Sequence, residues 1–361
     1  MKRLLIALSI IICHSSVCPT GAQAQTQVNP YTAGVTSDGA VFFLPKTAIR
    51  VRVLAEKTTF KPGEYAAYAQ RYLHLNDVGD EASVTHRIIS VDQMAVGVAD
   101  TTKAFSVKFN NKTAATNVAL SEDGVLLAIN GQAMPQRLPE RFLPTSKKPL
   151  PDPHQFLTQE ILAAGSLAKM AQLTAQEIYD LRENRNLLVK GQADFMPNDG
   201  KQMKMMLDQI DLQDRALTSL FCGTAVCDTL EYTFYVYPSG NVNNQMLFRF
   251  SRHFGMVGAD DLSGEPYTIT VTDLNTVPKA VADGKKKKVE NTSLYYNVPG
   301  RLRSVIVHGL NIVSQEEMPA AQFGNVELLS AELFNKHYGT RLWLNPVTGA
   351  IDKLEAEQPK K

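Results

Sequence analysis

Cys222 and Cys227, in the stretch FCGTAVC, are the residues of this sequence whose type and spacing most directly suggest chemistry. A metal site, a redox pair and a structural disulfide are the three interpretations. Zinc takes four ligands, and no Cys or His pair elsewhere has a matching spacing. A redox pair is typically C-x-x-C, whereas four residues separate these two thiols. The choice depends on where the protein resides, because disulfides persist in oxidising compartments.

The amino terminus has the pattern of a secretory signal peptide over residues 1–24. Lys2 and Arg3 precede an apolar run of about ten residues, which is too short to span a bilayer. The Ala-Gln-Ala sequence at 22–24 is a small-x-small cleavage site, so we expect cleavage between Ala24 and Gln25. An uncleaved anchor is the alternative.

A lipoprotein is disfavoured, because neither Cys13 nor Cys18 follows a small residue. No later segment has 18 consecutive apolar residues, so we expect no transmembrane helix in the mature chain. The protein is therefore predicted to be exported, and to be periplasmic or associated with the outer membrane. In that compartment the simplest interpretation of Cys222 and Cys227 is a disulfide, with two buried, reduced thiols as the alternative.

The charge balance argues against two classes of partner. Loss of Lys2 and Arg3 with the leader leaves 35 basic against 36 acidic residues, a formal net charge of −1. Such a balance gives no electrostatic reason to expect nucleic acid or an anionic membrane surface as a partner. The 337 residues that remain suggest two hydrophobic cores.

No motif of a catalytic or cofactor site is present in the sequence. It lacks a G-x-S-x-G nucleophile elbow, an H-E-x-x-H zinc motif and a glycine-rich dinucleotide fingerprint. Carboxylates are plentiful, and folding could bring two together as in a glycosidase, but no acidic motif indicates such a pair. We predict no catalytic, cofactor-binding or metal-binding residues. The mature histidines show no i,i+4 pair and are each interpreted as surface or packed residues: His74, His86, His154, His253, His308 and His337.

The first half of the chain is predicted to be β-rich. Residues 25–40 are polar and rich in Gly and Thr, and we expect a flexible lead-in. Residues 41–130 predict a domain of strands with one short helix, in which VFFLPKTAIRVRVLAE forms two strands around a proline turn. Asp123-Gly124 between apolar runs predicts a hairpin. Residues 131–165 contain six prolines and predict a connector.

The second half is predicted to begin with a helical hairpin over residues 166–221. A capping box of Thr174 and Glu177 predicts the start of its first helix. The PNDG sequence at 197–200 breaks the chain and offers Asn198 or Asp199 as the next N-cap.

Strand alternation then resumes and predicts a β-rich domain over residues 222–355, followed by a tail at 356–361. Pro299-Gly300 is interpreted as a tight turn, and TRLWLNPVTGAIDKL as a closing hairpin. The predicted fold class is α+β, mainly β.

Several stretches carry a family resemblance: FFLPKTAIRVRV, PGEYAAYAQRYL, VLLAIN, EIYDLRENRNLLVKGQADFMPNDG, LTSLFCGTAVCDTLEYTFYVYP, AQFG and LWLNPVTGAI. In these, the chain resembles a family of uncharacterised exported proteins of the Bacteroidetes, a domain-of-unknown-function family, over roughly residues 40–355. None of the stretches is a catalytic motif, so the resemblance implies export and an architecture but no activity. It also implies a species in which Asp-Thr-x sequences can be O-glycosylated, which makes Thr101 and Thr229 candidates.

We therefore expect a non-catalytic envelope protein that binds a partner protein or a glycan and needs no cofactor. Two alternatives stay open: a glycosidase-like hydrolase whose carboxylates meet only in the fold, and a structural component of the envelope. A deep pocket with two carboxylates would favour the hydrolase. An exposed apolar patch or an open strand edge would favour the binding protein.

Overall fold

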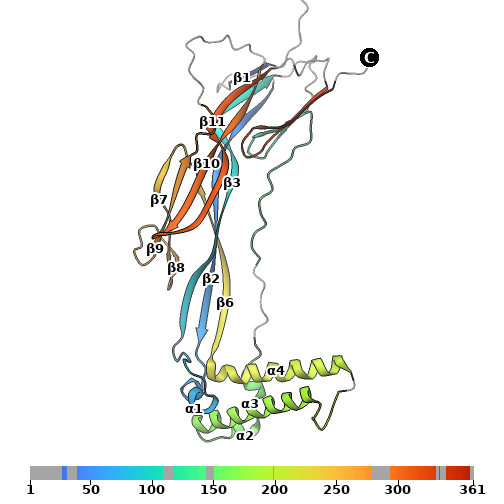
Figure 1. The fold of residues 1–361 in the computed structure, drawn as a ribbon, viewed down its shortest axis with the longest axis vertical. Coiled ribbons are helices and arrows are strands. Elements are labelled where there is room, and N and C mark those ends of the chain that lie inside the picture. The colour runs from blue at the N-terminus through green and yellow to red at the C-terminus, as the bar shows by residue number, and fades with distance from the viewer. Residues whose placement is uncertain are drawn as a thin grey trace, which may run out of the picture.

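The computed structural model describes residues 27–30, 39–108, 117–143, 150–197, 199–278, 293–330, 333 and 339–357. Figure 1 shows an elongated molecule with a β-rich head at one end and a helical base at the other. Between them runs a stalk of three strands, formed by residues 55–61, 83–90 and 224–231. The predicted class, α+β and mainly β, is confirmed. The predicted signal peptide and its Ala24–Gln25 cleavage site lie outside the described residues.

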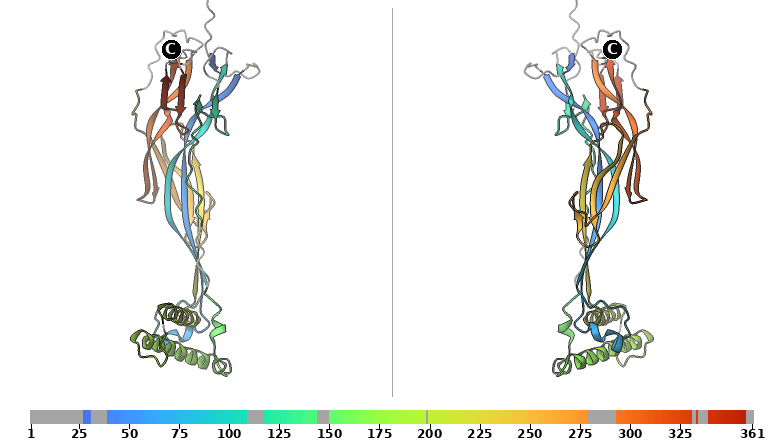
Figure 2. Two further views of the ribbon diagram at one scale, coloured as in Figure 1. Left: turned by 90° about the vertical axis from the view of Figure 1, so that its right-hand side faces the viewer. Right: turned by 90° about the vertical axis from the view of Figure 1, so that its left-hand side faces the viewer.

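The stalk belongs to a sheet of four antiparallel strands in the order β1-β3-β2-β6. These strands are β1 (Gln27–Pro30), β2 (Gly39–Lys61), β3 (Ser83–Lys108) and β6 (Thr224–Val236). β2 pairs with β3 from the head to the base, and with β6 along the lower part of the same path, from Ile49 to Lys61. The turned views in Figure 2 show these strands twisting about one another between head and base, as the right-handed twist of strands requires.

Two predictions about this sheet need correction. The proline turn predicted in VFFLPKTAIRVRVLAE is not a turn, because Pro45 lies inside β2 at a shift in register next to Phe43. Such a bulge accommodates the missing N–H of proline. The predicted lead-in at 25–40 contains β1, which pairs with Phe105–Lys108 at the end of β3.

A second sheet packs against the upper part of the first and completes a sandwich. Its order is β11-β10-β9-β7-β8. The strands are β7 (Val242–Ser251), β8 (Gly255–Val257), β9 (Glu265–Asp273), β10 (Ser293–His308) and β11 (Asn311–Ser330). The core between the sheets includes fully buried Ile49 and Val51 from β2 and Ile269 and Ile306 from β9 and β10. The turn predicted at Pro299-Gly300 is wrong, because β10 continues through it with a bulge.

A small third sheet lies at the far end of the head, in the order β13-β12-β5-β4. It contains β4 (Val118–Leu120), β5 (Leu126–Ile129), β12 (Gly339–Leu344) and β13 (Ile351–Glu357). The predicted hairpin at Asp123-Gly124 is confirmed between β4 and β5, and Gly124 adopts the positive φ of 77° that such a turn needs. The predicted closing hairpin is confirmed between β12 and β13.

Strands from the two predicted β-rich domains share sheets. β2 pairs with β6, and β5 pairs with β12. The division at residues 41–130 and 222–355 stays a prediction about folding units, but the two parts of the chain build one head. The connector between them also contacts the strands: the Gln136 side chain accepts from the Gly97 N–H at 3.1 Å and donates to the Ala95 carbonyl at 2.8 Å.

The base is a cluster of helices whose own core includes Tyr65, Ile178, Leu217 and Phe221. The elements are η1 (Ala66–Tyr68), α1 (Ala69–Leu73), η2 (Pro153–Phe156), α2 (Gln159–Leu162), α3 (Leu167–Lys190) and α4 (Gly200–Cys222). α3 and α4 form the predicted hairpin, held by ion pairs of Arg182 with Asp214 at 3.0 Å and of Arg185 with Asp211 at 2.7 Å.

The helix starts test the capping predictions. Asp199 caps α4 by accepting from the Gln202 N–H at 2.7 Å, as predicted for one of the two candidates. The capping box at Thr174 is wrong, because α3 begins two turns earlier, where the Ser166 hydroxyl accepts from the Lys169 N–H. Thr174 is instead buried inside the base.

Candidate functional site

Polar side chains gather in two places in the head, and the first is buried. The Thr47 hydroxyl accepts from the Ala321 N–H at 3.0 Å and donates to the Val347 carbonyl at 3.2 Å. The Asn297 amide nitrogen donates to the carbonyls of Pro45 at 2.9 Å and Thr348 at 2.8 Å. We call this set the polar junction: Pro45, Thr47, Asn297, Ala321, Gln322 and the turn 345–350.

The polar junction attaches β2 to β10, to β11 and to the turn between β12 and β13. Gln322 completes it, because its side chain accepts from the Thr47 N–H at 2.9 Å and donates to the Thr47 carbonyl at 2.7 Å. Thr47 is 1% exposed and Asn297 is 0% exposed, so solvent and ligands are excluded. FFLPKTAIRVRV, AQFG and LWLNPVTGAI, stretches that carried the resemblance, meet here. Their shared role at this point is architectural.

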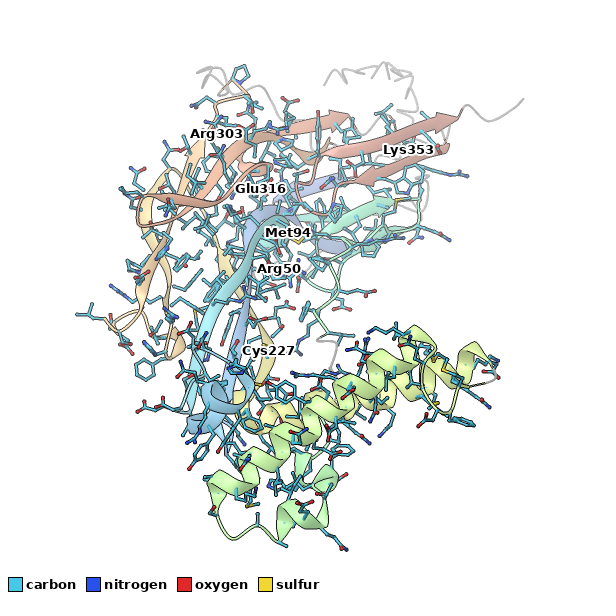
Figure 3. All side chains as sticks on the ribbon, turned by 60° about the horizontal axis from the view of Figure 1, so that its bottom comes forward. Arg50, Met94, Cys227, Arg303, Glu316 and Lys353 are labelled. Carbon is cyan, nitrogen blue, oxygen red and sulfur yellow. The ribbon has the colours of Figure 1, made fainter. Side chains whose placement is uncertain are left out.

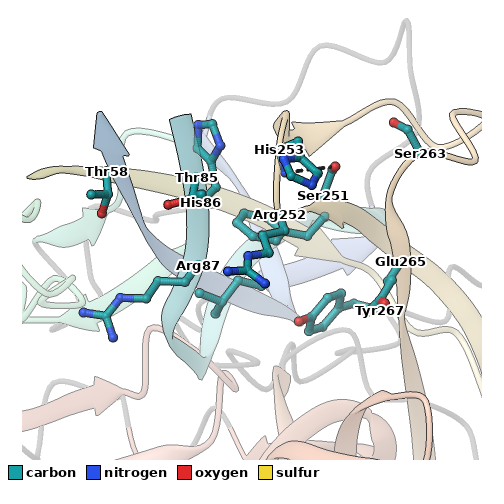
Figure 4. A pocket seen from close by; sticks show the side chains of 12 residues that line it. Thr58, Thr85, His86, Arg87, Ser251, Arg252, His253, Ser263, Glu265 and Tyr267 are labelled. Carbon is teal, nitrogen blue, oxygen red and sulfur yellow. Dashed lines mark hydrogen bonds between the residues drawn. The ribbon is translucent and has the colours of Figure 1, made fainter. Parts of the chain in front are cut away.

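The second polar region is an open cleft of about 630 Å³ where the stalk leaves the head, drawn in Figure 4. One wall comes from β2 and β3 of the stalk, and the other from the lower end of the five-stranded sheet. We call it the stalk cleft. Its lining residues are Thr58, Thr85, His86, Arg87, Ile88, Phe250, Ser251, Arg252, His253, Ser263, Glu265 and Tyr267.

The turn between β7 and β8 is attached to the stalk and holds two of the basic residues in place. The His86 N–H donates to the Arg252 carbonyl at 2.7 Å. The Ser251 hydroxyl accepts from the His253 N–H at 3.3 Å. Gly255 closes the turn with a φ of 74°, and a side chain there would come within 3.0 Å of the His86 ring. The backbone of the turn is thus fixed, while the side chains of Arg252 and His253 are exposed.

An aromatic stack supports the other wall. The rings of Phe234, Phe248, Tyr267 and His308 follow one another with centroid separations of 5.2, 4.6 and 4.4 Å. Neighbours therefore cover both faces of the Tyr267 ring, which cannot stack on a ligand. In the view of Figure 4 its hydroxyl points toward the same opening as the Arg252 guanidinium.

Tyr267 and Glu265 supply the polar groups of this wall. Burial, and secondarily the nearby Glu265 carboxylate, raises the pKa of Tyr267. Tyrosine is protonated at neutral pH even without this shift, so the hydroxyl is a hydrogen-bond donor there. Glu265, the single carboxylate of the cleft lining, contacts His308 through its Oε2 at 2.5 Å from Nε2.

The cations of the cleft differ in their partners. Arg87 forms an ion pair with Glu56 at 2.7 Å, and this contact raises the pKa of its guanidinium. Arg252 has no side-chain hydrogen bond and no ion pair within the described part of the chain. The cleft thus holds one cation that is neutralised inside the protein and one that is not.

The prediction that each histidine is an isolated surface or packed residue missed this grouping. Folding brings His86 and His253 into one cleft, with His308 behind Glu265. The Nδ1 atom of His86 is buried and has no partner among the described residues. A signal was present in the sequence, because His86-Arg87 and Arg252-His253 are two basic pairs that flank strand ends. Their convergence depends on pairing between strands far apart in the chain. His337 lies outside the described residues.

Cys222 and Cys227 are free and exposed in the structure, and the predicted disulfide is not formed in it. A disulfide so short would need the chain to bend back between the two cysteines. Instead, Cys222 is the last residue of α4, Gly223 ends the helix, and Cys227 lies inside the extended strand β6. Cys227 Sγ instead lies 3.6 Å from the Thr58 hydroxyl across the strand pair. Figure 3 places Cys227 on the stalk, nearer the base than Arg50.

The candidate glycosylation sites lie on strands. Thr101 is exposed on β3, and Thr229 is half-buried on β6 opposite Glu56. Asp100 accepts hydrogen bonds from the N–H and the hydroxyl of Thr102, at 3.1 and 2.7 Å. The side chain of Thr101 is left exposed. O-glycosylation at either threonine stays a prediction.

Within the described ranges, no group of three or more His, Cys, Asp or Glu residues is arranged to hold a metal ion. No helix there is long and apolar enough to cross a membrane. In comparisons with known proteins, a family model described as a domain of unknown function (DUF4831) matches residues 38–352. No curated protein and no solved structure matches the chain.

Proposed function

This chain belongs to the DUF4831 family, and we propose that it is an exported, non-catalytic binding protein of the cell envelope that holds its ligand in the stalk cleft. The observation that carries the proposal is the cleft itself: hydrogen-bonding groups from two separate elements line it, and the side chains of Arg252, His253 and Tyr267 have no hydrogen-bond partner among the described residues. Its volume of about 630 Å³ lies in the range typical of small-ligand sites. A rigid aromatic stack and an anchored turn hold its walls in place before any ligand arrives.

The cleft supports binding better than glycoside hydrolysis. Glycosidases place two carboxyl groups about 5–9.5 Å apart across the scissile bond, one as acid and one as base or nucleophile. Among the lining residues only Glu265 is acidic, and His308 already contacts its carboxylate. The alternative of a structural component of the envelope would use the elongated shape of the molecule and gives the cleft no function.

Exposed apolar side chains lie next to the cleft in the chain. Phe254 follows His253 and is 69% exposed, Leu262 precedes Ser263 and is 83% exposed, and Leu310 lies in the turn after His308 and is fully exposed. Exposed apolar groups around a polar depression favour contact with a partner. The cleft and these residues together support a site for a ligand larger than a lone ion.

Binding is tested with the mature chain, residues 25–361, on glycan and peptide arrays, followed by calorimetry on the best ligand. Ser263→Trp places a large side chain on the rim of the cleft and should weaken that ligand at least about tenfold, because it removes the space the ligand occupies. Ser239→Trp, in the exposed turn between β6 and β7, is the matched control and should bind as the unmodified chain does.

Two results would overturn the proposal. One is equal binding by Ser263→Trp and Ser239→Trp, which would place the ligand elsewhere. The other is release of product from glycoside substrates by the purified chain, lost in Glu265→Gln, which would make the cleft an active site. Circular dichroism and thermal melting of each variant confirm that it is folded.

A further inference from the structure

The stalk cleft has an excess of hydrogen-bond donors without partners. The Arg252 guanidinium carries five N–H donors and no acceptor, and it has no partner among the described residues. The Tyr267 hydroxyl is protonated at neutral pH, as tyrosine ordinarily is, and is a further donor that lines the cleft. Glu265, the one acidic residue among the described lining residues, contacts His308 instead. These donors are available to a ligand that supplies acceptors.

We infer that the ligand is a sugar that carries an oxyanion, such as a carboxylate or sulfate, and that Arg252 binds this group with help from the Tyr267 hydroxyl. The inference rests on the proposed function and names its ligand class. A guanidinium matches a carboxylate or sulfate through two parallel N–H bonds, which are stronger than bonds between neutral groups. Arg252 makes the charge-bearing contact, because Glu56 already neutralises Arg87.

The rest of the lining favours a sugar over a peptide. A peptide commonly binds by adding a strand to an open sheet edge. At this edge the His86 N–H already donates to the Arg252 carbonyl, so it cannot pair with the backbone of a bound peptide. The Thr85 hydroxyl and the His253 ring line the same cleft and can both donate and accept, as binding of sugar hydroxyls requires.

The test uses simple probes and the full mature chain. Glucuronate, glucose, sodium sulfate and a short polyglutamate peptide are titrated into residues 25–361 by calorimetry at one ionic strength set with chloride. We expect glucuronate to bind at least about tenfold more tightly than glucose, because only the acid forms a charge-assisted pair with Arg252. Glucuronate should also bind more tightly than sulfate, because the sugar ring adds contacts to the walls.

Variants locate the interaction. Arg252→Gln should weaken glucuronate at least about tenfold, and Arg252→Lys should recover part of the loss, since lysine keeps the charge but not the paired geometry. Arg303→Gln is the matched control: Arg303 is exposed on β10 and pairs with Glu317 at 2.7 Å outside the cleft. It removes the same charge and should leave glucuronate binding unchanged.

Each contrary result has a defined meaning. Equal affinity for glucose and glucuronate, or no effect of Arg252→Gln, would show that Arg252 does not bind an oxyanion of the ligand. If sulfate binds as tightly as glucuronate, or if polyglutamate binds more tightly, the ligand is not a sugar and the inference is wrong. If a neutral ligand binds and is lost in Ser263→Trp but not in Arg252→Gln, the inference fails while the proposed function stands.

Discussion

The polar junction and the stalk cleft use similar side chains under opposite conditions. In the junction, Thr47 and Asn297 are almost completely buried, and they bond to backbone groups of β2, β11 and the turn 345–350. In the cleft, Arg252 and His253 are exposed and their side chains have no partner within the described residues. One region uses its hydrogen-bonding capacity to hold strands together, and the other keeps that capacity available.

The difference shows how to separate architecture from binding in a chain without catalytic motifs. A buried group with partners is costly to remove, because the partners then lose a bond they cannot replace with water. An exposed group without partners costs little stability to remove. The two regions should therefore respond oppositely to substitution.

The largest effect is expected from Asn297→Leu in the junction. It leaves the buried carbonyls of Pro45 and Thr348 without their donor, which should lower the free energy of unfolding by about 3 kcal/mol. Asn311→Leu, at an exposed position at the start of β11, is the control and should change it by less than about 0.5 kcal/mol. Urea unfolding measures both. Equal stability of the two variants would show that the polar junction does not stabilise the fold.

Thr47→Val should follow with a loss of about 1–2 kcal/mol. Valine keeps the shape but leaves the buried Ala321 N–H without an acceptor. Thr101→Val, at an exposed position on β3, serves as the control. If the control lowers the free energy of unfolding as much as Thr47→Val does, the loss comes from replacing threonine in a strand and not from removing the buried hydroxyl.

The two regions should also differ in their response to alkali. The junction side chains Thr47, Asn297 and Gln322 do not titrate near pH 10, whereas Tyr267 does. Its folded pKa is raised above the unfolded value of about 10, so the folded state keeps the proton longer. Its contribution to stability is thus complete below pH 10 and is lost as pH rises through the folded pKa.

Thermal melting from pH 8 to pH 11 checks this prediction. Tyr267→Phe should lose less stability across that window than the unmodified chain. The comparison of the two curves is needed because burial also raises the pKa of Tyr65 and Tyr296. Identical slopes for both proteins would mean that Tyr267 is not desolvated in the cleft wall.

The smallest effect on stability is expected from Arg252→Gln. The guanidinium has no partner to lose among the described residues, so the free energy of unfolding at pH 7 should change by less than about 0.5 kcal/mol. Urea unfolding beside Asn297→Leu gives the contrast directly. A loss above about 1 kcal/mol would assign Arg252 a structural partner and weaken its role as a ligand-binding residue.

Local sequence patterns predicted many of the helices, strands and turns of this fold. They did not predict how strands far apart in the sequence pair. Asp123-Gly124 gave a hairpin and Asp199 a helix cap, since both signals act within a few residues. Pro45 was interpreted as a turn because proline breaks a strand unless a bulge accommodates it, and the bulge depends on partners in β3. The stalk cleft could not be predicted from local patterns for the same reason. His86 and Arg252 are far apart in the sequence and meet only because the strand and the turn are placed side by side in the fold.

The continuity of β2 has a mechanical consequence. One strand of 23 residues runs from the small sheet of the head to the base, with β3 antiparallel along nearly all of it and β6 along its lower part. A pull that separates head from base would act along the strands and load their hydrogen bonds in shear. Many rungs would then share the force at once instead of opening one after another. The protein is built to resist stretching along its long axis.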